Sequence, residues 1–181
     1  MGSPGWTGAG AEQGSAVGVG ETIKAVSWDL SAAPTRASVG WPAGDRTDVY
    51  HLPRHSAVRL ALPGGREFAA EDVQVFVQAP GDRIRGVEVQ TEPVAVPRAA
   101  AYASRLMREW EMDGPALTGW RAAALAEHAA GRGIPRTSRE TPRPIAAGGP
   151  VVGVQLFGSL DPERPVIVEV GFFWPDVPSV P

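Results

Sequence analysis

Two neighbouring segments with helical spacing lie between segments in which hydrophobic residues alternate, and this order limits the fold more than any other feature. Alternating segments occupy residues 23–91 and 151–173, whereas residues 97–130 have helical spacing. Strands grouped before and after a pair of helices, without regular βα units, are typical of an α+β domain. We therefore predict the α+β class: a mostly antiparallel sheet, two consecutive helices packed on one face, and a C-terminal β-hairpin.

The first strands are predicted at residues 23–30 and 58–62, with residues 37–41 as a short partner of the first. Because Pro63-Gly64-Gly65 ends the second strand and the chain resumes at Phe68, we expect a hairpin there. The clearest alternation covers residues 73–78, where every second residue is valine, and a turn at Gly81 follows.

The next strand is predicted over residues 83–91, but its alternation slips. Ile84 and the pair Val87/Val89 have opposite parity, with Gly86 between them. A slip of one residue turns side chains to the other face of a sheet, so we expect a bulge at Arg85-Gly86 that restores the register.

Two helices follow. The first begins at Pro97, which is tolerated in the first helical turn, and the second covers residues 117–130 and ends at Gly131 or Gly133. The expected buried stripe of the first consists of Ala99, Tyr102, Ala103, Leu106, Met107 and Trp110. The expected inner face of the second consists of Leu117, Trp120, Ala124, Leu125 and His128.

The chain closes with two apolar strands, at residues 151–157 and 166–173, which we expect in the interior of the sheet. A loop rich in proline and arginine, residues 132–150, precedes them. Residues 1–20 contain seven glycines and are predicted to be a flexible tether, so we expect residues 21–181 to form a single domain.

Composition excludes several function classes. The chain has no cysteine, which removes disulfides, thiolate catalysis and iron–sulfur clusters. Its net charge of −3 disfavours a general nucleic-acid binder, and we expect no nucleic-acid partner. No apolar run suits a transmembrane helix, and the first twenty residues lack the pattern of a signal peptide.

One group of residues resembles a metal or acid–base site: Asp45, Asp48, His51 and His55. Carboxylate oxygens and imidazole nitrogens are good ligands, but Pro53 opposes a helix that would place the two histidines on one face. In an extended chain the histidines are about 13 Å apart, too far for one ion. We therefore expect a polar loop, with no catalytic residue, cofactor or metal, and keep the metal site as the alternative.

Two further groups are candidates for partner contact. The loop arginines Arg132, Arg136, Arg139 and Arg143 suit an acidic partner or anionic lipid headgroups, the alternative being a solvated connector. Trp41 and Trp174 each precede a proline near a strand end, so they suit either an exposed contact surface or packing over the sheet edge.

These observations favour a non-catalytic module that binds a protein or another macromolecule, because no complete catalytic constellation is present. The alternatives are a small metal-dependent hydrolase that uses Asp45, Asp48, His51 and His55, or a carrier with a ligand pocket between helices and sheet. We expect a soluble cytoplasmic protein. The alternative is a cell-envelope domain tethered through residues 1–20.

Overall fold

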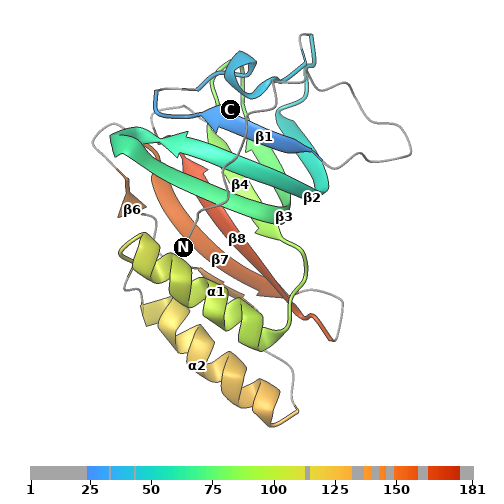
Figure 1. Ribbon diagram of the computed structural model, residues 1–181, viewed down its shortest axis with the longest axis vertical. Helices are drawn as coiled ribbons and strands as arrows, with labels where there is room; N and C mark the ends of the chain where they lie inside the picture. Colours follow the sequence, from blue (N-terminus) through green and yellow to red (C-terminus); the bar gives the residue numbers. More distant parts are fainter. Residues whose placement is uncertain are drawn as a thin grey trace, which may run out of the picture.

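The computed structural model of the protein describes residues 24–32, 34–42, 44–112, 115–131, 137–139, 143–145, 149–158 and 163–175. An eight-stranded sheet and two helices form one body, with the helices side by side next to the C-terminal strands (Figure 1). The strands run in the order β1-β2-β3-β4-β8-β7-β5, and the short β6 also pairs with β7.

The bounds of the elements follow the chain. The strands are β1 (Ala25–Asp29), β2 (Val49–Leu62), β3 (Arg66–Gln78), β4 (Gly86–Thr91), β5 (Thr137–Arg139), β6 (Arg143–Pro144), β7 (Val151–Gly158) and β8 (Val166–Phe173). The helices are α1 (Val96–Glu109) and α2 (Pro115–Ala129), and two short 3₁₀ turns lie at Ala37–Val39 and Pro63–Gly65.

The predicted class is confirmed. Every strand pair is antiparallel except β1 with β2, and β7 and β8 form the C-terminal hairpin. β8 lies between β4 and β7, as the continuous apolar run of this strand predicts. Mostly antiparallel pairing allows one face of the sheet to be buried while the other carries polar side chains.

The core lies between one face of the sheet and α1. The valines at 73, 75 and 77 are at most 2% exposed, so the alternation in β3 predicted their face correctly. Leu106 of α1 and Trp110, which directly follows the helix, are buried as predicted, and the Trp110 ring meets the ring of Phe172 in β8 edge to face at 5.6 Å. Burial of this stripe holds α1 against the sheet.

The β2–β3 hairpin is strongly bent, and this bend determines the shape of the molecule. Its register shifts twice, between Leu52 and Ser56 and again between Ser56 and Val58. Beyond the bend, Phe68 of β3 contacts Phe172 of β8, with ring centroids 5.3 Å apart, although these two strands are not neighbours in the sheet. The outer half of the hairpin (57–62 and 66–70, hereafter the distal hairpin) therefore folds over the core.

Side-chain interactions stabilise the bend. His55 and Asp72 both have positive φ, 62° and 58°, which is unusual for residues other than glycine. The His55 Nδ1 and Asp72 Oδ1 atoms lie 2.6 Å apart, so the two left-handed residues are hydrogen-bonded across the hairpin. The fully buried Ser56 hydroxyl donates to the Pro53 carbonyl at 2.7 Å, which satisfies a backbone group that the bulge removes from the ladder.

One prediction for the first half of the chain is wrong. Residues 37–39 form a 3₁₀ turn and not a partner strand, and β2 is the neighbour of β1 instead. The change of parity lies where it was predicted, at the start of β4: Gly86 pairs with Gln78, and the Arg85 N–H also donates to the Gln78 carbonyl, at 2.7 Å. Ile84 is fully buried just before the strand, and its N–H donates to the Pro34 carbonyl.

Corrections also apply to the second half. Leu125 is 40% exposed and His128 is exposed, so the buried face of α2 is the narrower set Leu117, Trp120 and Ala124. The predicted loop at 132–150 contains two short strands, β5 and β6, which add to the open side of β7. The edge of β7 offers backbone N–H and C=O groups without partners in the sheet, so β5 and β6 can pair with it despite the nearby prolines.

Candidate functional site

Arg36 organises the segment that contains Asp45 and Asp48, two residues of the alternative metal site. Its guanidinium donates to the carbonyls of Asp45, Thr47 and Ala79 at 2.8, 2.7 and 2.6 Å. It also lies 3.6 Å from the Asp48 carboxylate and 4.3 Å from the centre of the Trp41 ring. This cation holds the segment around 41–48 against the end of β3, which is a structural role.

Asp45 has its own local partners. Its carboxylate accepts hydrogen bonds from the backbone N–H and the hydroxyl of Thr47, both at 2.8 Å, and from the Trp41 indole at 3.2 Å. The backbone hydrogen bond from Thr47, followed by that from the Thr47 hydroxyl, lowers the pKa of Asp45. A carboxylate used in this way terminates a turn.

The two histidines lie within β2 and not in a loop as predicted, because pairing with β3 begins at Val49. The His51 ring lies 6.4 Å from the ring of Phe76, its cross-strand neighbour. His55 binds Asp72, and that hydrogen bond raises the pKa of the imidazole. Each of the four candidate ligands thus has a separate environment.

Within the described part of the chain, no group of three or more acidic or histidine side chains is placed to hold a metal ion. The Asp45 carboxylate binds Thr47 and Trp41, Asp48 faces Arg36, and His55 faces Asp72. The residues that the sequence placed in one candidate site are therefore not brought together.

The candidate contact residues also separate. Trp41 and Trp174 are each 5% exposed, so they pack into the core and offer no contact surface. Arg139 lies in β5 and Arg143 in β6, where their backbones pair with β7. Arg132 and Arg136 lie outside the described residues.

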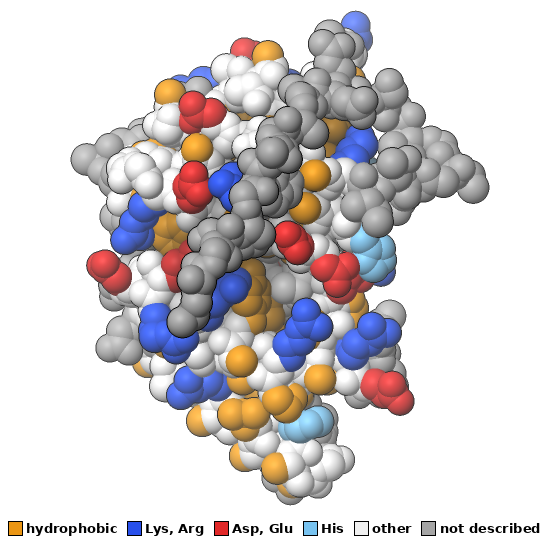
Figure 2. All heavy atoms as spheres, viewed as in Figure 1, with side chains coloured by type: hydrophobic (Ala, Val, Ile, Leu, Met, Phe, Trp, Pro, Cys, Tyr) orange, Lys and Arg blue, Asp and Glu red, His pale blue; other side chains and the backbone are white. Residues whose placement is uncertain are grey.

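A groove lies between the distal hairpin and α1. The sequence left open a ligand pocket between helices and sheet but did not identify its residues. The groove has a volume of about 820 Å³. We call it the hairpin–helix groove, and it is lined by Val26, Ala57, Val58, Arg59, Ala69, Ala70, Glu71, Asp72, Val73, Thr91, Glu92, Pro93, Val94, Ala95, Arg98, Ala101, Tyr102, Arg105 and Arg164. Residues of both the hairpin and α1 line it, and on the face drawn in Figure 2 hydrophobic side chains lie near the middle with Lys or Arg side chains beside them.

Small side chains explain why space remains between these elements. Eleven of the nineteen lining residues are alanine, valine, proline or tyrosine, and five of these are alanine. Val26, Ala70 and Tyr102 are half-buried and pack against the main core, so the floor of the groove is continuous with it. Protein interiors are close-packed and leave few voids. Larger side chains at the alanine positions would therefore occupy the space that the groove now leaves open.

The α1 wall of the groove is cationic. Arg98, Ala101, Tyr102 and Arg105 lie at spacings of three, four and seven residues, which places them on one helical face. The Arg105 guanidinium lies 4.7 Å from the centre of the Tyr102 ring. Neither Arg98 nor Arg105 forms an ion pair with any other residue that the structure describes.

Carboxylates also line the groove, but two of the three have basic partners. Asp72 binds His55, and Glu92 lies 3.7 Å from Arg54. Glu71 is exposed on the hairpin side. The groove thus combines an apolar floor, one cationic wall and an opposite wall of mixed charge.

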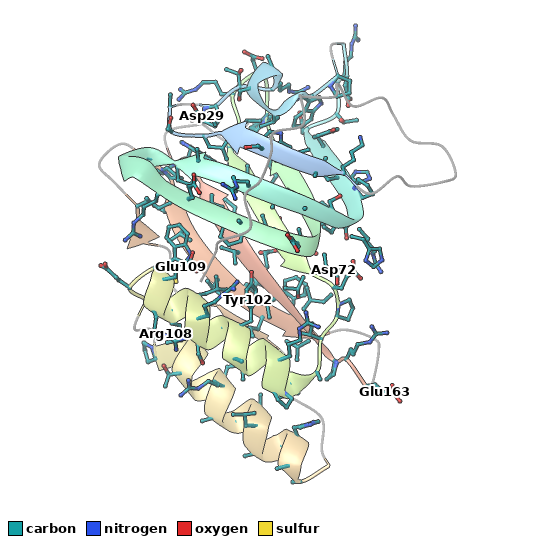
Figure 3. The ribbon with its side chains drawn as sticks, in the orientation of Figure 1. Asp29, Asp72, Tyr102, Arg108, Glu109 and Glu163 are labelled. Carbon is teal, nitrogen blue, oxygen red and sulfur yellow. The ribbon has the colours of Figure 1, made fainter. Side chains whose placement is uncertain are left out.

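Tyr102 lies at the centre of this arrangement. In Figure 3 it projects from α1 toward the strands, on the side where Asp72 also lies, whereas Arg108 lies nearer the C-terminal end of the helix. Burial raises the pKa of Tyr102. Its phenol is therefore neutral near pH 7 and can donate a hydrogen bond to a ligand.

No protein family, curated protein or solved structure was found to match this chain. Of the helices that the structure describes, none has both the length and the apolar character needed to cross a membrane. The groove geometry is accordingly the main observation that bears on function.

Proposed function

We propose that the protein is a non-catalytic binding module that holds a small ligand in the hairpin–helix groove. The observation that carries this proposal is the groove itself, about 820 Å³ between two elements that belong to the same body. Ligand pockets in proteins typically have volumes of about 300–1,000 Å³, with mostly apolar walls and a few polar groups that orient the ligand.

The chemistry of the lining supports binding rather than catalysis. Tyr102 and the arginines can hold a ligand through hydrogen bonds and charge. The groove contains one imidazole-linked carboxylate, Asp72, whose partner His55 is 60% exposed in its side chain. A general base must come within hydrogen-bond reach of the proton that it removes, and His55 is not among the residues that line the groove.

The proposal is tested by screening a chemically diverse fragment library against the ¹⁵N-labelled full chain and following amide chemical shifts. We expect fragments that perturb Ala69, Ala101 and Tyr102, which line the groove, more than residues of α2. Ala101 is exposed on α1, so Ala101→Trp should fill the groove without disturbing the core.

Ala116→Trp provides the matched control, because Ala116 is exposed on α2 and does not line the groove. Loss of fragment binding in Ala101→Trp but not in Ala116→Trp would support the groove as the site. If no fragment perturbs the groove, or if Ala101→Trp binds as the unaltered chain does, the proposed function is wrong.

A further inference from the structure

The distribution of charge in the hairpin–helix groove points to the class of ligand, an inference that rests on the proposed function. We propose that the groove takes a single-chain anionic amphiphile, with the apolar chain on the alanine and valine floor and the acidic head group between Arg98 and Arg105. The head group can be a carboxylate or a phosphate, since both accept hydrogen bonds from guanidinium groups.

The position of the two arginines carries the argument for the head group. They lie seven residues apart on one face of α1, with Tyr102 between them, and neither pairs with a carboxylate of the described chain. Two cations that line a groove next to an apolar floor make an anion the complementary ligand. An acidic head would therefore find charge and hydrogen-bond donors already in place.

The floor carries the argument for the chain. Val26 of β1, Ala70 of β3 and Tyr102 of α1 come from three elements and pack against the core beneath the groove. They remain half-buried, so part of their apolar surface faces the groove. An aliphatic chain laid on them would remove this surface from water, which favours binding in proportion to the area covered.

The charges on both walls of the groove determine which sign of head group it accepts. Glu71 is exposed there, while Asp72 and Glu92 bind His55 and Arg54. A positively charged amphiphile would meet the two arginines of α1, and like charges brought together in a groove disfavour binding. The groove should thus select anionic over cationic amphiphiles with the same chain.

The experiment measures dissociation constants of the full chain for four probes below their critical micelle concentrations: decanoate, decyl phosphate, decyl maltoside and decyltrimethylammonium. Inorganic phosphate is the fifth probe and tests the head group alone. We expect the two anionic amphiphiles to bind at least about tenfold more tightly than the neutral and cationic ones, because charge-assisted hydrogen bonds discriminate by this amount or more.

Variants assign the roles of the residues. Arg98→Gln combined with Arg105→Gln should remove most of the preference for anionic over neutral probes and leave decyl maltoside binding nearly unchanged. Arg108→Gln is the matched control, since Arg108 is exposed on α1 but does not line the groove. Ala101→Trp should abolish binding of all the amphiphiles.

The outcomes separate this inference from the proposed function. If neutral or cationic amphiphiles bind as tightly as the anionic ones and Ala101→Trp still abolishes binding, the groove is a ligand site but the anionic class is wrong. If inorganic phosphate binds as tightly as decyl phosphate, the ligand is a free anion and the chain-binding role is wrong. If none of the probes binds, this inference is overturned, while the fragment screen separately decides the proposed function.

Discussion

Removal of the Arg36 side chain should destabilise the protein by an amount that the structure allows us to work out. The guanidinium donates three hydrogen bonds to backbone carbonyls, and those to Asp45 and Ala79 are partly buried. The third, to Thr47, is exposed, so water can replace it at little cost. The guanidinium also lies over the Trp41 ring.

In Arg36→Met, two partly buried carbonyls lose a charged donor, and a cation–π contact disappears. A hydrogen bond in a position that water partly reaches contributes about 1–1.5 kcal/mol and the ring contact about 0.5 kcal/mol, so the free energy of unfolding should fall by about 3 kcal/mol. Arg36→Lys keeps the charge but cannot span three carbonyls, and we expect it to lose about 1.5 kcal/mol.

The assay is equilibrium unfolding in urea, with thermal unfolding as a second measurement. For a domain of this size, a loss of 3 kcal/mol corresponds to a fall in Tm of about 6–12 °C. Arg46→Met is the matched control, since Arg46 is exposed in the same segment and should change stability by less than about 0.5 kcal/mol. Equal effects of the two methionine variants would refute the structural role of Arg36.

Other predictions concern the bend, the core and the sheet. His55 titrates above its usual pKa because of the hydrogen bond to its aspartate partner, so its stabilising effect is present below about pH 6.5 and is lost as pH rises through the raised pKa. An NMR titration should show this, and His55→Gln should remove that part of the pH dependence of Tm. Trp110→Ala should cost about 3–5 kcal/mol in urea unfolding, while Arg108→Ala should cost less than about 0.5 kcal/mol, and equal costs would contradict the orientation of α1. Gly171→Ala places a Cβ 2.3 Å from the ring of Phe173 and should cost about 1–3 kcal/mol, a loss that Phe173→Ala in the same chain should reduce.

Periodicity in the sequence was sufficient to predict the class of fold and most faces. The alternation of valines in β3 and the stripe of α1 identified buried residues correctly. In each case a single element packs one of its faces against the core, and this produces the periodicity. The prediction for α2 was less accurate. Leu125 was expected on the buried face of this helix, but it is 40% exposed because the core does not extend to it. Periodicity shows which way a residue points and not how far the neighbouring layer extends.

The arrangement of the four candidate ligands could not be predicted, for a related reason. Asp45, Asp48, His51 and His55 are close in sequence, but their partners are distant: Asp48 faces Arg36 and His55 faces Asp72. A cation or carboxylate that the tertiary structure places beside one of these residues can bind it and keep it away from the others. Spacing along the chain carries no information on that choice, so nearness in sequence was a weak guide.

The hairpin–helix groove depends on a bend that local patterns do not reveal. His55 and Asp72 both adopt positive φ, a conformation that histidine and aspartate tolerate better than most residues, but the alternation pattern does not mark these two positions. They turn the distal hairpin over the core, and the groove arises where its alanines and those of α1 are too small to fill the remaining space. Arg98 and Arg105 lie outside the buried stripe that the sequence predicted for this helix, so periodicity assigned them no role. Their role as one wall of a groove follows from the bend, so any change that straightens the hairpin should remove the site while leaving α1 intact.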